Sequence, residues 1–266
     1  MELLNRKLMD GGPRLMIELK ARLTKELQQD INLKVMGSLI WNLPIHLIEI
    51  EYKTVLRTKM DILMKMMLIA FGKAEFSTVE ELSEVLLVEQ LFITDLIDKM
   101  SRTGVIEKRE GFFSLTEAGI EQLKKGVFEH EPEKKSTQTL YSPSHSAFLI
   151  GEIKNSAYEN AEVYRYFVGF DERDLAVIED DLLIEALKKS GVESGEGNVQ
   201  IIVSEIISAS DLATESSQCI EFHLYNKSED ILYARVWNTL TSHWDEVIEA
   251  QLNEKERKKW RETYLA

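Results

Sequence analysis

The chain has 266 residues, of which 44% are hydrophobic and 29% charged, the composition of a globular protein long enough for two or three compact units. No apolar run approaches the ~18 residues of a membrane-spanning helix, and the first residues lack the apolar core of a secretory signal, so we expect a cytoplasmic protein. The formal net charge of −14 opposes attraction to a nucleic-acid backbone, so any contact with DNA must come from a local basic patch.

The first predicted elements precede residue 58. Residues 14–30 fit either a helix or a strand followed by a helix. Residues 45–56 alternate between apolar and polar side chains, which is the pattern of a half-buried strand. A lone strand is not stable, and this strand has no evident partner nearby in the sequence. We therefore expect it to join a sheet formed by the C-terminal part of the chain, which makes the intervening segment an insertion or an arm.

Four helices and one hairpin are predicted between residues 58 and 128. An apolar helix ends near Gly72, and the capping-box pattern "STVEE" begins a second, short helix. A third helix runs from about Glu89 to Thr103. The stretch "VIEKREGFFSL" predicts two short strands around a tight tip, and Thr116 is placed to cap a fourth helix.

This order of elements resembles the winged helix superfamily, which includes MarR-type regulators and the winged helix subunits of chromosome-organising complexes. The resemblance covers residues 58–128 and is carried by "STVEELSEVL", "LIDKMSRTGVIEKREG" and "FSLTEAG" in that order and spacing. It implies a winged helix domain whose third helix would be the one to enter a DNA groove. Because the superfamily contains DNA-binding and protein-binding members alike, the resemblance does not by itself choose between these functions.

The apolar periodicity of the sequence is interrupted after residue 128. Residues 129–147 contain two of the four prolines and little apolar periodicity, which is typical of a linker. A helix capped by Asp171 is then predicted over residues 172–191, and a terminal helix capped by Ser242 ends the chain. The strands expected in this part are residues 162–170, 199–207, 219–226 and 231–238, the last two joined as a hairpin.

The predicted fold is therefore α+β, with a central winged helix-turn-helix domain and a C-terminal α/β domain. The expected boundaries place an N-terminal helix/strand segment at residues 1–57, the winged helix domain at 58–128, the linker at 129–147 and the C-terminal domain at 148–266. The C-terminal domain is assigned from its pattern of strands and helices alone, because the resemblance ends at residue 128.

The third predicted helix offers few groups that suit recognition of bases. Its expected outer face carries Asp95 and Asp98, which would oppose phosphate unless they pair with Lys99 and Arg102 at helical spacing. In the wing, two cations precede the tip and suit contact with backbone phosphate. The candidate nucleic-acid-binding residues are Gln90, Thr94, Arg102, Lys108 and Arg109.

Apolar side chains on the same helix and on the wing favour a protein partner instead. The candidate partner-binding residues are Leu91, Phe92, Phe112 and Phe113. The alternative is that Phe92 and one of the two wing phenylalanines belong to the core, as large aromatic side chains commonly do.

Motifs for catalysis are missing from the sequence. It has no glycine-rich phosphate loop, no nucleophile elbow and no zinc-protease motif, and its single cysteine, Cys219, excludes an internal disulfide and a multi-cysteine zinc site. Glu221 and His223 lie on one face of a predicted strand, and Asp245 follows His243 closely, but no third partner of a hydrolytic site is evident. We expect no catalytic residue, no bound metal and no cofactor.

These patterns predict a non-enzymatic accessory subunit of a larger, DNA-handling assembly that acts mainly through protein contacts. DNA contact is then weak or indirect, and no membrane is involved. Two alternatives stay open. One is a DNA-binding winged helix regulator, a homodimer through its terminal helices, and the other is a hydrolase or nuclease with its site in the C-terminal domain.

Overall fold

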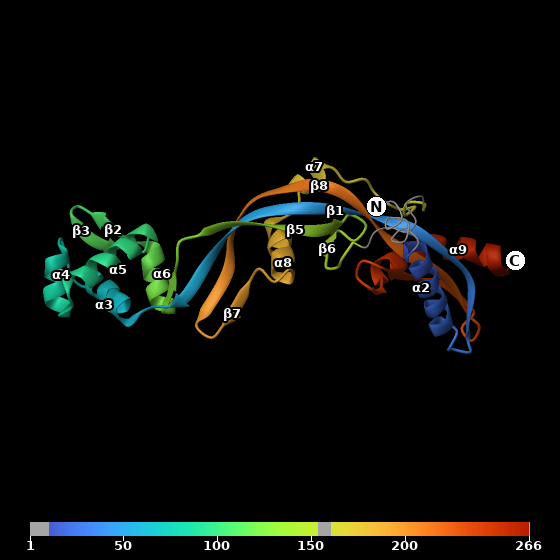
Figure 1. Cartoon of the computed structure of the whole chain (residues 1–266), viewed down its shortest axis with the longest axis horizontal. Coiled ribbons are helices and arrows are strands. Elements are labelled where there is room, and N and C mark those ends of the chain that lie inside the picture. The colour runs from blue at the N-terminus through green and yellow to red at the C-terminus, as the bar shows by residue number, and fades with distance from the viewer. Residues whose placement is uncertain (1–10, 154–160, 266) are drawn as a thin grey trace, which may run out of the picture. The chain divides into compact units, whose positions relative to one another are not determined.

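A computed structural model of the chain describes residues 11–153 and 161–265 (Figure 1). Over these residues, eight strands form one antiparallel sheet. Two long strands, β1 (Leu33–Lys59) and β8 (Val199–Asn226), lie side by side in it. The other strands are β5 (Glu133–Ser142) and β4 (Val127–Glu129) on β1, β6 (Ala147–Leu149) on β5, β9 (Ile231–Asn238) and β7 (Ser194–Glu196) on β8, and β10 (His243–Trp244) on β9.

The predicted fold class is wrong, because this sheet dominates the chain and not a central winged helix followed by an α/β domain. β8 contains both of the strands that were predicted at residues 199–207 and 219–226, together with residues 208–218 between them. These intervening residues are polar and show no apolar alternation. Backbone hydrogen bonds to a neighbouring strand hold such a stretch extended without apolar side chains, so its pattern gives no strand signal. The prediction that residues 45–56 pair with the C-terminal sheet is confirmed, since β1 pairs with β8.

The chain divides into two compact units, and both are built from separate segments. The described parts of residues 1–50, 137–186 and 209–266 form one, here called the sheet unit, and residues 51–136 with 187–208 form the helical unit. The boundaries predicted from the sequence assume contiguous domains and differ from this division. Residues 129–147, predicted to be a linker, contain β5, whose backbone pairs with β1, and they end at the first residue of β6, which pairs with β5.

The helical unit contains the elements that were predicted between residues 58 and 128, in the predicted order. They are α3 (Ile62–Phe71), α4 (Val79–Leu86), α5 (Gln90–Arg102), the hairpin of β2 (Ile106–Arg109) and β3 (Phe112–Leu115), and α6 (Glu117–Lys125) (Figure 1). Met67, Leu82 and Ile93 are fully buried where these helices meet. Thr78 forms the predicted capping box with Glu81, and Thr116 caps α6. The resemblance to the winged helix superfamily stays a prediction.

The sheet unit buries opposite faces of β8 against two helices. Side chains alternate along a strand, so Ile220, Phe222 and Leu224 pack against the apolar stripe of α2 (Gly11–Leu27). Cys219 belongs to the core on the other face, which α9 (Glu246–Leu265) covers with residues such as Leu252. None of the described helices combines the length and the apolar character needed to cross a membrane.

Several local predictions in the sheet unit need correction. Residues 162–170 form no strand and contribute only an isolated bridge from Val163 to Asn42. The helix predicted over residues 172–191 is divided into α7 (Glu172–Ala176) and α8 (Asp180–Lys189). Ser242 does not cap α9, because β10 follows it and Asp245 accepts the hydrogen bond from the backbone N–H of Ile248. The predicted strand 231–238 is confirmed as β9. Residues 1–10, 154–160 and 266, which fall in predicted domains, lie outside the described residues.

Candidate functional site

The turn between α4 and α5 exposes large apolar side chains. Val85, Leu87, Leu91 and Phe92 are 62%, 90%, 76% and 59% exposed. We call these four residues the apolar turn surface. They fall within eight consecutive residues, whereas exposed apolar residues on a protein surface are usually scattered singly. Leu91 and Phe92 were predicted from the sequence as partner contacts, and the structure places Val85 and Leu87 in the same segment.

Leu87 adopts a backbone conformation that leucine rarely takes. It is the C-cap of α4 with φ 55° and ψ 40°, the left-handed region that favours glycine. The backbone N–H groups of Leu87 and Val88 both donate to the carbonyl oxygen of Ser83, and the Ser83 hydroxyl donates to the Val88 carbonyl at 2.6 Å. These hydrogen bonds hold the turn in place. A leucine here costs about 1 kcal/mol or more in backbone energy and gains no burial in return.

Acidic side chains surround the apolar turn surface in the sequence. Glu84, Glu89 and Asp95 are all exposed and belong to the same two helices and their turn. Two of the residues predicted to read bases, Gln90 and Thr94, are exposed on α5, but the Thr94 hydroxyl donates to the Gln90 carbonyl at 2.8 Å. The surface that would approach a DNA groove is therefore apolar and acidic, a poor match for phosphate and base edges.

The cations that were predicted to contact DNA all have partners within the protein. Arg102 pairs with Glu131 at 3.1 Å, and Arg109 pairs with Glu107 in the wing. Lys108 donates to the carbonyl oxygen of Ser77 at 3.2 Å, and its Nζ lies 5.0 Å from the ring centre of Phe113. These contacts direct the three cations toward the protein's own groups.

The two wing phenylalanines have different surroundings. Phe113 is half-buried and packs against the helical core, 5.7 Å from Phe71 between ring centres. Phe112 is 38% exposed. The wing thus exposes one aromatic ring to solvent, while the other packs against the helical core.

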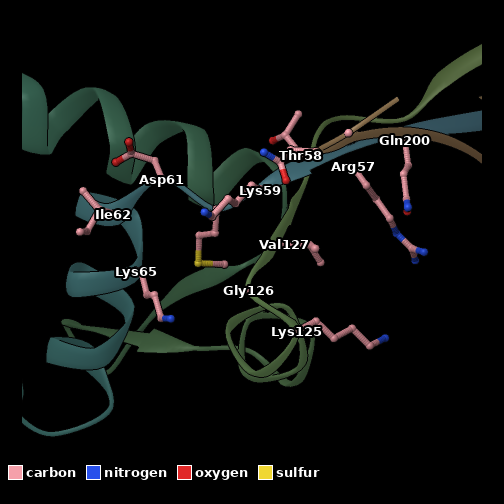
Figure 2. A pocket seen from close by; sticks show the side chains of 13 residues that line it. Arg57, Thr58, Lys59, Asp61, Ile62, Lys65, Lys125, Gly126, Val127 and Gln200 are labelled. Atoms are coloured by element: carbon pink, nitrogen blue, oxygen red, sulfur yellow. The ribbon is translucent and has the colours of Figure 1, made fainter. Parts of the chain in front are cut away.

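A second feature of the helical unit is a basic pocket with a volume of about 870 Å³. Figure 2 shows its cationic side chains, which come from the end of β1, from α3 and from the end of α6. The residues that line it are Arg57, Thr58, Lys59, Met60, Asp61, Ile62, Lys65, Lys125, Gly126, Val127, Gly197, Asn198 and Gln200. Sequence reasoning missed this pocket, because its cations belong to separate segments and form no motif.

The sheet unit holds a charged carboxylate in its core. Glu221 has no exposed side-chain surface, and its two oxygens accept two hydrogen bonds of 2.8 Å from Arg165 and one each from Trp41 and His223. Burial opposes ionisation, but the hydrogen bonds from His223 and Arg165 outweigh it and lower the pKa of Glu221 to about 2. Because no surface of the carboxylate is accessible, we assign it a structural role.

A serine, a histidine and an aspartate also meet in the sheet unit. The Ser142 hydroxyl lies 2.7 Å from His145 Nδ1, and His145 Nε2 lies 2.9 Å from a carboxylate oxygen of Asp245, which also accepts from Asn238. These residue types can form a hydrolytic site, but Ser142 is 0% exposed and presents no nucleophile to a substrate. The hydrogen bonds join the turn after β5 to the start of α9.

Of the predicted site residues, Leu91 and Phe92 are exposed in the same segment as Val85 and Leu87, and Phe112 is exposed on the wing. In the sequence, Leu87 lies between the second and third predicted helices. A polar residue or glycine is expected at such a position, so a leucine there is the one signal that the sequence offered. Among the described residues, no group of three or more histidine, cysteine, aspartate or glutamate side chains is arranged to hold a metal ion. Comparisons with protein families, with curated proteins and with solved structures returned no match.

Proposed function

We propose that this chain is a cytoplasmic, non-enzymatic accessory subunit of a larger assembly, and that it binds a protein partner through the apolar turn surface. Leu87 carries the proposal. Its side chain is 90% exposed on a backbone of positive φ that three hydrogen bonds maintain. A strained residue that contributes nothing to the protein's own core is explained if a partner buries it.

The surroundings of the apolar turn surface define the chemistry of the partner. Glu84, Glu89 and Asp95, all exposed, lie within or close to its segment of the chain, and the three candidate DNA-binding cations are engaged within the protein. A complementary partner therefore presents an apolar centre with lysine or arginine around it. Contact with DNA, if the assembly handles DNA, is weak or indirect for this chain.

In the alternative function, a DNA-binding regulator, the same elements contact DNA instead of a protein. It requires Arg102, Lys108 and Arg109 to leave their present partners and requires the acidic turn to approach phosphate. The first step gives up two exposed ion pairs and one hydrogen bond and costs little, but the second step is unfavourable because it brings like charges together. The protein-binding function needs neither step.

Site-specific crosslinking tests the proposal. A photo-crosslinking amino acid is placed at Leu87 in the full chain, and at Ile120, which is 45% exposed on α6, as the matched control. We expect a protein adduct from position 87 that position 120 does not give, also after nuclease treatment. The captured protein is then purified and its affinity for the chain is measured by calorimetry.

Two double variants separate the candidate functions in that measurement. Leu91→Asp with Phe92→Ser should weaken binding of the purified partner more than about tenfold, whereas Lys108→Ala with Arg109→Ala should leave it within about twofold. The proposal fails if position 87 crosslinks nucleic acid, if it gives no adduct beyond the control, or if the wing variant alone loses binding.

A further inference from the structure

The basic pocket of the helical unit concentrates positive charge in an acidic protein. Four cations, Arg57, Lys59, Lys65 and Lys125, line it, and Asp61 is the only carboxylate among its lining residues. The chain as a whole carries a net charge of −14. Like charges placed around one hollow repel each other, and an anion in the hollow relieves that repulsion.

The one acidic residue that lines the pocket, Asp61, is engaged as a helix cap. The Asp61 side chain caps α3 and accepts from the backbone N–H groups of Leu63 at 2.8 Å and Met64 at 3.4 Å. Its charge also stabilises the positive end of the α3 dipole. Asp61 therefore does not neutralise the cations by direct pairing.

Two of the four cations have no acidic partner in the part of the chain that the structure describes. Lys59 and Lys65 are exposed and enter no ion pair there. Lys125 pairs with Glu121 at 2.6 Å, and Arg57 pairs through Nε with Glu129 at 2.6 Å. The two terminal nitrogens of Arg57 have no hydrogen-bond acceptor among the described residues, so its guanidinium can still donate to a ligand.

Cations from separate elements act on one exposed carboxylate beside Lys125, that of Glu121. A hydrogen bond from Lys125 lowers the pKa of Glu121, and the charges of Arg57 and Lys124 act in the same direction. Arg57 and Lys125 come from β1 and α6, so the positive potential at the pocket is built by different elements. In Figure 2, Arg57 and Lys125 lie toward one side of the pocket and Lys59 and Lys65 toward the other.

We propose that this pocket binds the phosphate group of a nucleotide or of a nucleotide chain. A phosphate offers several acceptor oxygens and up to two negative charges, which suits a guanidinium with unused donors and two unpaired ammonium groups. The side-chain amides of Asn198 and Gln200 line the same pocket as neutral hydrogen-bonding groups.

The size and the apolar lining of the pocket leave room for a ligand larger than phosphate. A volume of about 870 Å³ lies in the range of sites for small organic ligands. Ile62, which is 75% exposed, and Val127 line it beside the cations and provide apolar contact for a base or a sugar. This site is independent of the apolar turn surface, and either can fail without the other.

Binding is measured on the full chain with inorganic phosphate and adenosine monophosphate by calorimetry, and with a fluorescein-labelled single-stranded oligonucleotide by anisotropy at several salt concentrations. Lys59→Ala with Lys65→Ala is compared with Lys73→Ala with Lys135→Ala, which removes the same charge from exposed positions of the helical unit outside the pocket. Thermal unfolding of both variants checks that they fold.

We expect the pocket variant to bind the nucleotide or the oligonucleotide about tenfold more weakly, with the slope of log oligonucleotide affinity against log salt lower by about 0.7 for each lysine removed. The control variant should stay within about twofold of the unmodified chain. Binding of adenosine monophosphate identifies a free nucleotide as sufficient, and binding of the oligonucleotide alone identifies a nucleotide chain. The proposal is overturned if none of the probes binds or if both double variants lose affinity equally.

Discussion

Arg165 and Glu221 form a doubly hydrogen-bonded ion pair beneath α9. Nη1 of the guanidinium donates to Oε2 and Nη2 donates to Oε1, each at 2.8 Å, and the carboxylate has no exposed surface. Nε of Arg165 also donates to Glu256 on α9. His223, which donates to the same carboxylate, is 2.8 Å from the hydroxyl of Tyr264, also on α9. The pair therefore links β8, the segment around residue 165 and the terminal helix.

Removal of Arg165 should destabilise the protein strongly. Arg165→Met leaves the Glu221 carboxylate buried without its main partner, and loss of one member of a buried ion pair typically costs about 3–5 kcal/mol. The free energy of unfolding is measured in urea. Arg261→Met, which breaks the exposed pair with Asp230, is the control and should change stability little. Equal effects of the two substitutions would contradict the structural role of Glu221.

Stability should fall in acid because of Glu221. Burial raises the pKa of this carboxyl group, but the hydrogen bonds from His223 and Arg165 lower it to about 2, from 4.5 for an ordinary glutamate. Because the pKa is lower in the folded than in the unfolded state, the stabilisation is complete above pH 4.5 and is lost as the pH falls toward 2. The free energy of unfolding is followed against pH in the unmodified chain and in Glu221→Gln. The acid loss should be smaller in the variant, and parallel curves would exclude this assignment.

Replacement of Leu87 by glycine should raise the stability of the protein and weaken its binding to the proposed partner. Leu87→Gly removes the steric cost of a positive φ and should stabilise the protein by up to about 1 kcal/mol, whereas Leu87→Ala keeps that cost. Both variants remove a side chain that the proposed partner buries, so both should bind it more weakly. Stability is measured in urea. A glycine variant no more stable than the alanine variant would show that the turn does not hold this conformation in solution.

The rate at which a thiol reagent labels Cys219 should measure the opening of the protein core. Its side chain is fully buried, and burial, together with the charges of Asp245 and Glu221, raises the pKa of the thiol. Since the thiolate is the reactive form, a thiol reagent should label the native protein only as fast as the core opens. Labelling is followed at increasing urea concentration. Ser136→Cys in a Cys219→Ser background is exposed and should react at once, while rapid labelling of native Cys219 would contradict its burial.

The helices and the hairpin of the helical unit could be predicted from the sequence because their signals are local. The capping box of Thr78 and Glu81, the Thr116 cap and the apolar spacing of α5 all act within a few residues. β9 was predicted for the same reason, since its side chains alternate between buried and half-exposed. Leu91 and Phe92 were predicted as contacts because an apolar pair at a helix start is visible without a structure.

The long strands, the division into units and the basic pocket depend on tertiary structure. Residues 133–142 and 208–218 are extended because their backbones pair with strands distant in sequence, which no local pattern indicates. The cations of the pocket meet only when the end of β1, α3 and the end of α6 come together. The sequence by itself therefore determined the elements stabilised by their own residues, whereas pairing and packing between distant segments decided the sheet and the pocket, because those energies exist only in the folded chain.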